Sequence, residues 1–140
     1  MFILPSEVEG EGVTGESIGK SSKWIKTGIE FYNGQPLVGT VARDEWADWS
    51  LYPNGIVDVD GGRQGVEILI ERAEKDDTFW VFVVGEGGVK LPIREVTWVL
   101  SEKPGEREVW VGVYAATPNP AKEGEELEVL FEGLEYGFRE

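Results

Sequence analysis

The sequence contains neither cysteine nor histidine. Without cysteine, a disulfide framework and thiolate metal sites are excluded. Without histidine, the serine–histidine and cysteine–histidine nucleophile systems are excluded, together with the usual zinc and iron ligand sets. We therefore expect no metal and no cofactor, and we expect binding rather than nucleophilic catalysis.

Basic residues are also scarce: the chain has 13 lysines and arginines against 27 acidic residues, and its net charge is −14. Such a field repels phosphate backbones and anionic lipid surfaces, so nucleic acid and membranes are poor partners. No apolar run approaches the roughly 20 residues of a membrane helix, and the apolar start at residues 1–4 is too short for a signal peptide. We expect a cytoplasmic protein whose partner is another protein or a neutral glycan, unless the charge serves solubility alone.

The 140 residues are 41% hydrophobic, which suits a single domain with one core. Residues 1–22 are rich in glycine, glutamate and serine and predict a loose lead-in with at most one weak strand. Residues 23–140 form the predicted domain.

Period-two alternation of apolar residues predicts antiparallel β-structure from residue 23 onward. The Asn33-Gly34 turn signal makes residues 23–43 a hairpin, which Gln35 and Pro36 are expected to lengthen slightly. Further strands are predicted at 66–72, 78–84, 94–100, 108–116 and 127–132, with turn chemistry between them. Several short strands at regular spacing indicate an all-β sandwich or barrel.

The same alternation predicts an aromatic and charged face on the sheet. Trp24, Lys26, Glu30 and Tyr32 lie opposite the apolar stripe of the first hairpin, and the strand at 108–116 repeats the pattern. A loop at residues 46–50 is expected to close a cleft beside this face. The candidate ligand-binding residues are Trp24, Lys26, Glu30, Tyr32, Asp48, Trp49, Trp110 and Tyr114.

Indole faces stack on the C–H surfaces of sugars, while a lysine and a carboxylate hydrogen-bond to hydroxyl groups, so this face suits a glycan-like ligand. The alternative is a solvated face with a Lys–Glu pair and packing tryptophans, in which Trp46 or Trp49 plugs one end of the sandwich.

Four segments carry a family resemblance: WIKTGIE at 24–30, DWS at 48–50, GVYAATP at 112–118 and VLFEG at 129–133. Across roughly residues 23–133 the chain resembles the "regulation of enolase protein" family, a concanavalin A-like family of largely unknown function. The resemblance implies a jelly-roll β-sandwich and implies no catalytic residues or cofactor.

The N-terminal part of the chain differs from that family. Family members carry several more strands and a YDQAG-like segment before the tryptophan, and residues 13–20 do not match it. We therefore expect a sandwich that lacks some N-terminal strands and has an unpaired edge beside the Trp24 strand, unless residues 1–22 cover it. Homodimerisation through that edge is a plausible outcome.

Catalytic and metal motifs are incomplete. The Glu-x-Asp-x-x-Glu pattern of sandwich glucanases begins at Glu74 and Asp76 but has Phe79 in its last position. Asp58 and Asp60 open a calcium-like loop that lacks its closing glutamate, so a turn is the better interpretation. Three functions stay open: a non-catalytic binding or regulatory sandwich, a carbohydrate-active enzyme with an unidentified acidic pair, and a structural fragment without a site.

Overall fold

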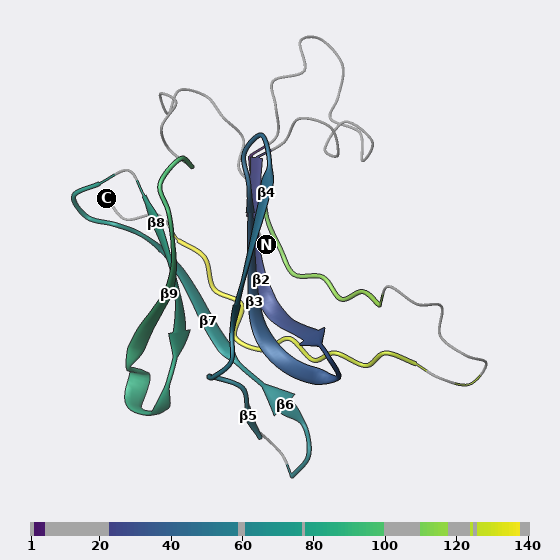
Figure 1. The fold of residues 1–140 in the computed structure, drawn as a ribbon. Helices are drawn as coiled ribbons and strands as arrows, with labels where there is room; N and C mark the ends of the chain where they lie inside the picture. The colour runs from purple at the N-terminus through teal and green to yellow at the C-terminus, as the bar shows by residue number, and fades with distance from the viewer. Residues whose placement is uncertain are drawn as a thin grey trace.

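The computed structural model describes residues 2–4, 23–58, 61–76, 78–99, 110–117, 124 and 126–137. Within these ranges the protein is all-β, and its one helical element is the 3₁₀ turn η1 (Glu86–Gly88). Two antiparallel sheets face each other as the layers of a sandwich (Figure 1). The fold class predicted from alternation is therefore confirmed.

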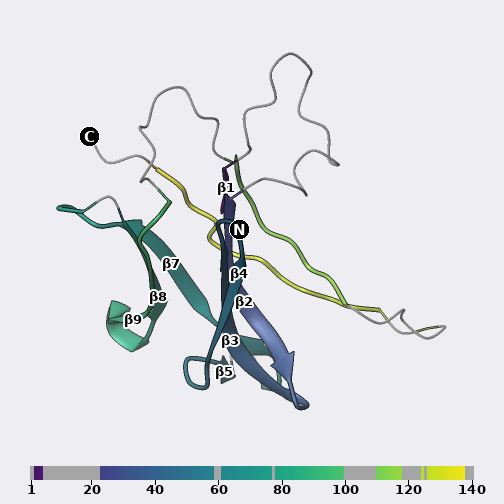
Figure 2. The same cartoon turned by 45° about the horizontal axis from the view of Figure 1, so that its top comes forward.

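The larger sheet has five strands in the order β10-β1-β2-β3-β4. Its strands are β1 (Phe2–Leu4), β2 (Lys23–Tyr32), β3 (Gln35–Arg43), β4 (Ala47–Tyr52) and β10 (Trp110–Val111). The smaller sheet has three strands, β7 (Glu67–Arg72), β8 (Phe79–Val84) and β9 (Lys90–Val96), in that order. A short ribbon of β5 (Val57–Asp58) and β6 (Gln64–Gly65) joins the two layers along the chain (labelled in Figure 1, turned in Figure 2).

The core lies between the two sheets and is built mainly from β-branched residues at alternate strand positions. Ile25 and Ala42 face each other across β2 and β3, and they cluster with Val81 of β8 and Val96 of β9. Val99, just after β9, is buried in the same cluster. The cluster is flanked by the partly buried residues Ile68, Ile70, Phe79, Ile93 and Trp98.

The first hairpin is tighter than the sequence suggested. Asn33 and Gly34 have φ angles of 52° and 75° and form a two-residue turn, because Tyr32 pairs directly with Gln35. Positive φ at both turn positions gives the twist that matches a hairpin, which asparagine and glycine tolerate best. Gln35 and Pro36 belong to β3 and do not lengthen the turn.

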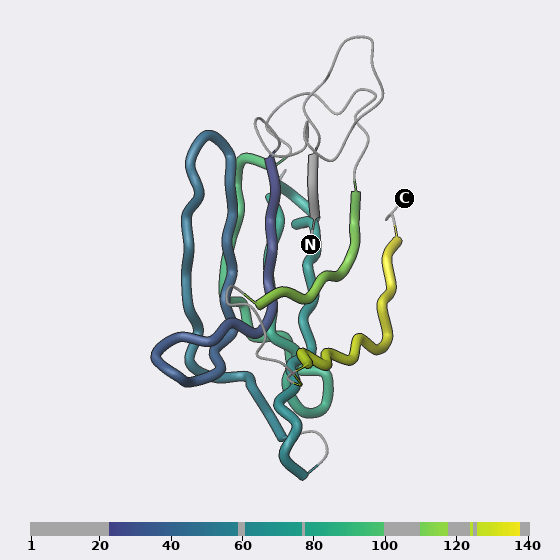
Figure 3. Tube along the Cα trace, turned by 90° about the vertical axis from the view of Figure 1, so that its right-hand side faces the viewer, coloured from purple at the N-terminus to yellow at the C-terminus, as the bar shows by residue number. Residues whose placement is uncertain are grey.

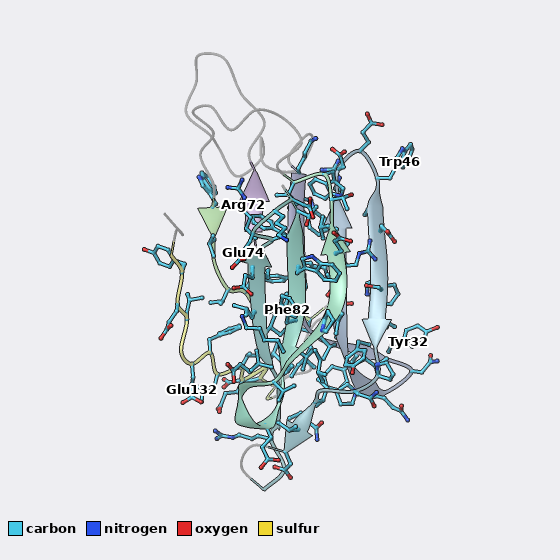
Figure 4. All side chains as sticks on the ribbon, turned by 90° about the vertical axis from the view of Figure 1, so that its left-hand side faces the viewer. Tyr32, Trp46, Arg72, Glu74, Phe82 and Glu132 are labelled. Atoms are coloured by element: carbon cyan, nitrogen blue, oxygen red, sulfur yellow. The ribbon has the colours of Figure 1, made fainter. Side chains whose placement is uncertain are left out.

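Other strands differ from their predicted positions. The strand expected at 94–100 lies at Lys90–Val96, because the chain pairs with β8 as soon as it leaves the turn after Gly85. The strand expected at 108–116 is reduced to Trp110–Val111 within its described part, while residues 100–109 lie outside the described residues. The segment expected as a strand at 127–132 has no ladder among the described residues, and Figures 3 and 4 show residues 126–137 outermost on the β10 side of the molecule.

The edge beside the Trp24 strand is partly covered. Residues 2–4 form β1, which pairs with Lys23, Trp24 and Ile25 of β2 and, on its other side, with β10. The beginning of the lead-in thus supplies a strand to the larger sheet. Residues 5–22, the remainder of the predicted lead-in, lie outside the described residues.

Candidate functional site

The candidate site lies on the outer face of the five-stranded sheet, the face turned away from the core. Residues paired across neighbouring strands point to the same side. One cross-strand row joins Trp24 to Arg43, and through Ile3 to Trp110. The next row on this face joins Lys26, Val41 and Trp49. Sequence alternation therefore placed the aromatic and charged residues of β2 and β10 on one face.

The floor of this face is a trough of glycines. Gly28 of β2 pairs with Gly39 of β3, and Gly39 is buried although it faces outward. A Cβ atom at Gly39 would lie 2.7 Å from Cδ of Glu30, so the Glu30 side chain lies directly on the Gly39 backbone. The trough thus holds a carboxylate against the sheet.

Lys26 and Glu30 form an ion pair along this trough, with 2.9 Å between Nζ and Oε1. Their side chains are 30% and 25% exposed, so the pair is mostly covered yet reachable from solvent. The hydrogen bond to Glu30 raises the pKa of Lys26 above its ordinary value of 10.5, while partial burial opposes that rise. Tyr114 contributes a further, smaller rise in the pKa of Lys26, which places its phenol beside the ammonium group.

Tyr114 reaches Lys26 from a segment far away in the sequence. After β10, residues 112–117 continue without a strand and leave the sheet on its outer side (Figures 1 and 3). This segment therefore forms one wall of the site, with Tyr114 half-exposed above the Lys26–Glu30 pair.

The raised pKa of Lys26 predicts a specific dependence of stability on pH. A lysine whose pKa is raised by folding contributes stability that is complete below its unfolded pKa and is lost as the pH rises through the folded pKa. The difference in unfolding free energy between the wild type and Lys26→Met should be about 0.2–1 kcal/mol at neutral pH. It should shrink only above about pH 10. Urea unfolding of both proteins from pH 7 to 11.5 measures it, and a difference that grows with pH would contradict the assigned pairing.

The second wall is aromatic. Tyr32 and Trp49 meet edge to face, with 5.9 Å between ring centroids and an interplanar angle of 74°. Trp49 pairs with Val41 and Tyr32 with Gln35, so their rows are six residues apart on β3, roughly 20 Å along a flat strand. Their contact requires the hairpin end to curve toward the outer side, as β2 and β3 do in Figure 1. The outer face is therefore concave.

Asp48 does not belong to this face, and its assignment to the site was wrong. Residues 47–52 form the strand β4 rather than a closing loop, so Asp48 points to the opposite side from its neighbour Trp49. There it forms an ion pair with Arg94 of β9, which ties the two sheets together. Trp46 is 84% exposed at the β3–β4 turn and Trp49 is 48% exposed, so neither indole plugs an end of the sandwich.

A second aromatic surface was missed by the sequence reasoning. Trp80 and Phe82 alternate on β8 with the core residues Val81 and Val83, and they stack on the outer face of the three-stranded sheet. The signal was present, because the alternation that defines the core side of β8 also places both rings opposite it.

Metal and membrane features are absent from the described ranges. No group of three or more Asp or Glu residues there has the geometry to hold a metal ion. Among the described residues, no helix is long and apolar enough to cross a membrane.

Comparisons with known proteins identify relatives without a known activity. A family model described as "Protein of unknown function (DUF1349)" matches residues 17–138. A protein of Emericella nidulans described as "Uncharacterized protein AN7484" is 47% identical over 112 residues, which are 80% of this chain and 51% of that relative. The chain thus spans about half the length of this relative. No solved structure matches, and neither comparison bears out the enolase-related name suggested by the resemblance.

Proposed function

The chain belongs to the DUF1349 family of proteins of unknown function, and on that premise we propose that it is a non-catalytic binding module for a neutral, polyhydroxylated ligand of the glycan type. The ligand lies in the concave outer face of the five-stranded sheet. The observation that carries the proposal is the convergence of the Lys26–Glu30 pair, Tyr114 and the Tyr32–Trp49 contact on that face.

The chemistry of these groups suits a sugar. Tyr32 and Trp49 are both 48% exposed and offer apolar ring surface to the C–H face of a pyranose. Lys26 donates hydrogen bonds and Glu30 accepts them, so hydroxyl groups find both kinds of partner. Because the pair is neutral as a unit and the chain carries −14, an anionic ligand is disfavoured.

A carbohydrate-active enzyme is the alternative function, and the site geometry supports it less well. A retaining glycosidase needs two carboxyl groups about 5–5.5 Å apart. Among the described residues, the ion pair and ring contacts of this face involve one carboxylate, that of Glu30, and it is held in the ion pair with Lys26. A cytoplasmic regulatory role stays a prediction, and so does homodimerisation through a sheet edge such as β4, which pairs only with β3 among the described residues.

Affinity electrophoresis in gels that contain soluble neutral polysaccharides tests the proposal. The gels would hold mixed-linkage glucan, xyloglucan, galactomannan or arabinoxylan. The wild type should be retarded by at least one of them. Lys26→Ala and Glu30→Ala should each weaken binding at this face roughly tenfold, as expected when a polar anchor of a binding site is removed, and the retardation should fall accordingly.

Lys23→Ala is the matched control, because Lys23 lies on the same strand but in an ion pair with Asp44 rather than Glu30. It should bind as the wild type does. All three variants should stay folded, since pairs of this exposure contribute only about 0.2–1 kcal/mol. Retardation of none of the proteins, or an equal loss in Lys23→Ala, would overturn the proposal.

A further inference from the structure

The outer face of the three-stranded sheet carries a second aromatic surface with its own polar groups. Trp80 and Phe82 stand two residues apart on β8, with ring centroids 6.2 Å apart and an interplanar angle of 28°. Both rings are half-buried, so they form a supported, nearly flat apolar floor. Such a floor accepts another flat apolar surface without an ordering cost for the rings themselves.

An ion pair between Lys90 and Glu71 crosses this aromatic floor. Nζ of Lys90 lies 5.9 Å from the centroid of Phe82 and 2.8 Å from Oε2 of Glu71. Lys90 lies on β9 and Glu71 on β7, so the ion pair spans the whole three-stranded sheet across β8. The Glu71 side chain is 20% exposed and that of Lys90 is 46% exposed, so the carboxylate is fixed while the ammonium group faces solvent.

A depression of about 300 Å³ opens beside the Lys90–Glu71 ion pair. Its floor is Trp80 and Phe82, and its polar lining is Glu71, Arg72, Glu74 and Lys90. Figure 4 looks onto this sheet and labels Arg72, Glu74 and Phe82. The volume is at the small end of the range of ligand pockets, which suits one ring of a larger ligand.

The charges of the lining decide the class of ligand. Two carboxylates and two cationic groups leave the depression without net charge, and they supply acceptors and donors in equal number. A cationic ligand would meet Lys90 and Arg72, while an anionic one would meet Glu71 and Glu74 and a chain charge of −14. A neutral ring with hydroxyl groups at its edge and C–H bonds on its face satisfies both the floor and the lining.

We propose that this depression is a second glycan-binding site, centred on Trp80 and independent of the site on the five-stranded sheet. The two sites lie on opposite outer faces of the sandwich, because each is on the side of its sheet turned away from the shared core. A protein molecule with both sites occupied therefore cross-links two polysaccharide strands, because sites on opposite faces do not engage one strand together.

The test follows the indole N–H signals of the six tryptophans in ¹⁵N-labelled protein during titration with cellohexaose, xylohexaose and mannohexaose. The Trp80 signal is assigned by its loss in Trp80→Phe. We expect it to shift with at least one of the three oligosaccharides. Glu71→Gln, which keeps the aromatic floor and the reporting indole intact, should weaken the affinity measured from the Trp80 signal roughly tenfold.

Lys26→Ala separates the two proposals. If the second site is independent, the Trp80 shift survives in Lys26→Ala with unchanged affinity. If Lys26→Ala abolishes the Trp80 shift, or if the wild-type Trp80 signal is unmoved by all three oligosaccharides, this inference is overturned while the first site can still bind. If Trp80 shifts but the Trp49 signal does not, the proposed function at the first face fails and the second site stands.

Discussion

Replacing Ile25 by alanine is expected to lower the free energy of unfolding by about 2–5 kcal/mol. Ile25 is 0% exposed and is the β2 residue that packs into the cluster formed with Val81 and Val96 of the other sheet. Its loss removes apolar contact from both layers and leaves a cavity between them. The expected cost is a large part of the total stability of a domain of this size.

Urea unfolding followed by tryptophan fluorescence measures this effect. Val89→Ala is the control, because Val89 is 58% exposed and its replacement should change the unfolding free energy by no more than about 0.5 kcal/mol. If Ile25→Ala cost less than about 1 kcal/mol, the two sheets would not pack through this residue, and the sandwich described above would be wrong.

The second large effect is expected at Gly55. This residue has φ +93°, and a Cβ atom placed on it would lie 2.7 Å from Cγ1 of Val83, a buried side chain of β8. Alanine there incurs left-handed backbone strain of about 1–2 kcal/mol. The forced movement of Val83 adds about 1–3 kcal/mol. Gly55→Ala should therefore lower the unfolding free energy by about 2–5 kcal/mol in total.

Gly61→Ala isolates the backbone part of that effect. Gly61 has φ +61°, and no atom of the described residues lies within 4 Å of the Cβ position, so its replacement carries the backbone strain alone. The two variants are compared by thermal and urea unfolding under the same conditions. Equal destabilisation of both would show that the chain after β4 does not pack against Val83.

The hairpin and the core were predictable because they rest on local signals. Alternation around Ile25 and the Asn33-Gly34 turn fix the register of β2 and β3 within a few residues of chain. The strand β4 was missed for an equally local reason. Its inward positions carry Asp48 and Ser50, which bond to Arg94 and to the Thr40 carbonyl across strands, so no apolar stripe marks them.

The positions of the later strands depend on pairing with distant strands, which the local sequence pattern does not reveal. Pro92 lies in the middle of β9, where it is tolerated because β9 is an edge strand among the described residues and the ladder is irregular beside it. Residues 127–132 have strand-like composition, but a strand exists only where another strand pairs with it. Leu130 and Phe131 are 65% and 47% exposed instead.

The candidate site was predictable as a face but not as a shape. Alternation assigned Trp24, Lys26 and Glu30 to one side of β2. It could not show that Glu30 lies on Gly39, that Tyr114 reaches Lys26, or that curvature brings Tyr32 to Trp49. Each of these contacts joins different strands or segments, and it follows from tertiary structure rather than from spacing in one strand.

A crystal structure of the protein with a bound neutral oligosaccharide tests the central claim most directly, using the sugar that retards the wild type in affinity electrophoresis. The account predicts a pyranose ring against Tyr32 and Trp49, with hydroxyl groups within hydrogen-bonding distance of Lys26 Nζ and the Glu30 carboxylate. A sugar bound elsewhere, with the concave face of the five-stranded sheet empty at saturating concentration, would contradict it.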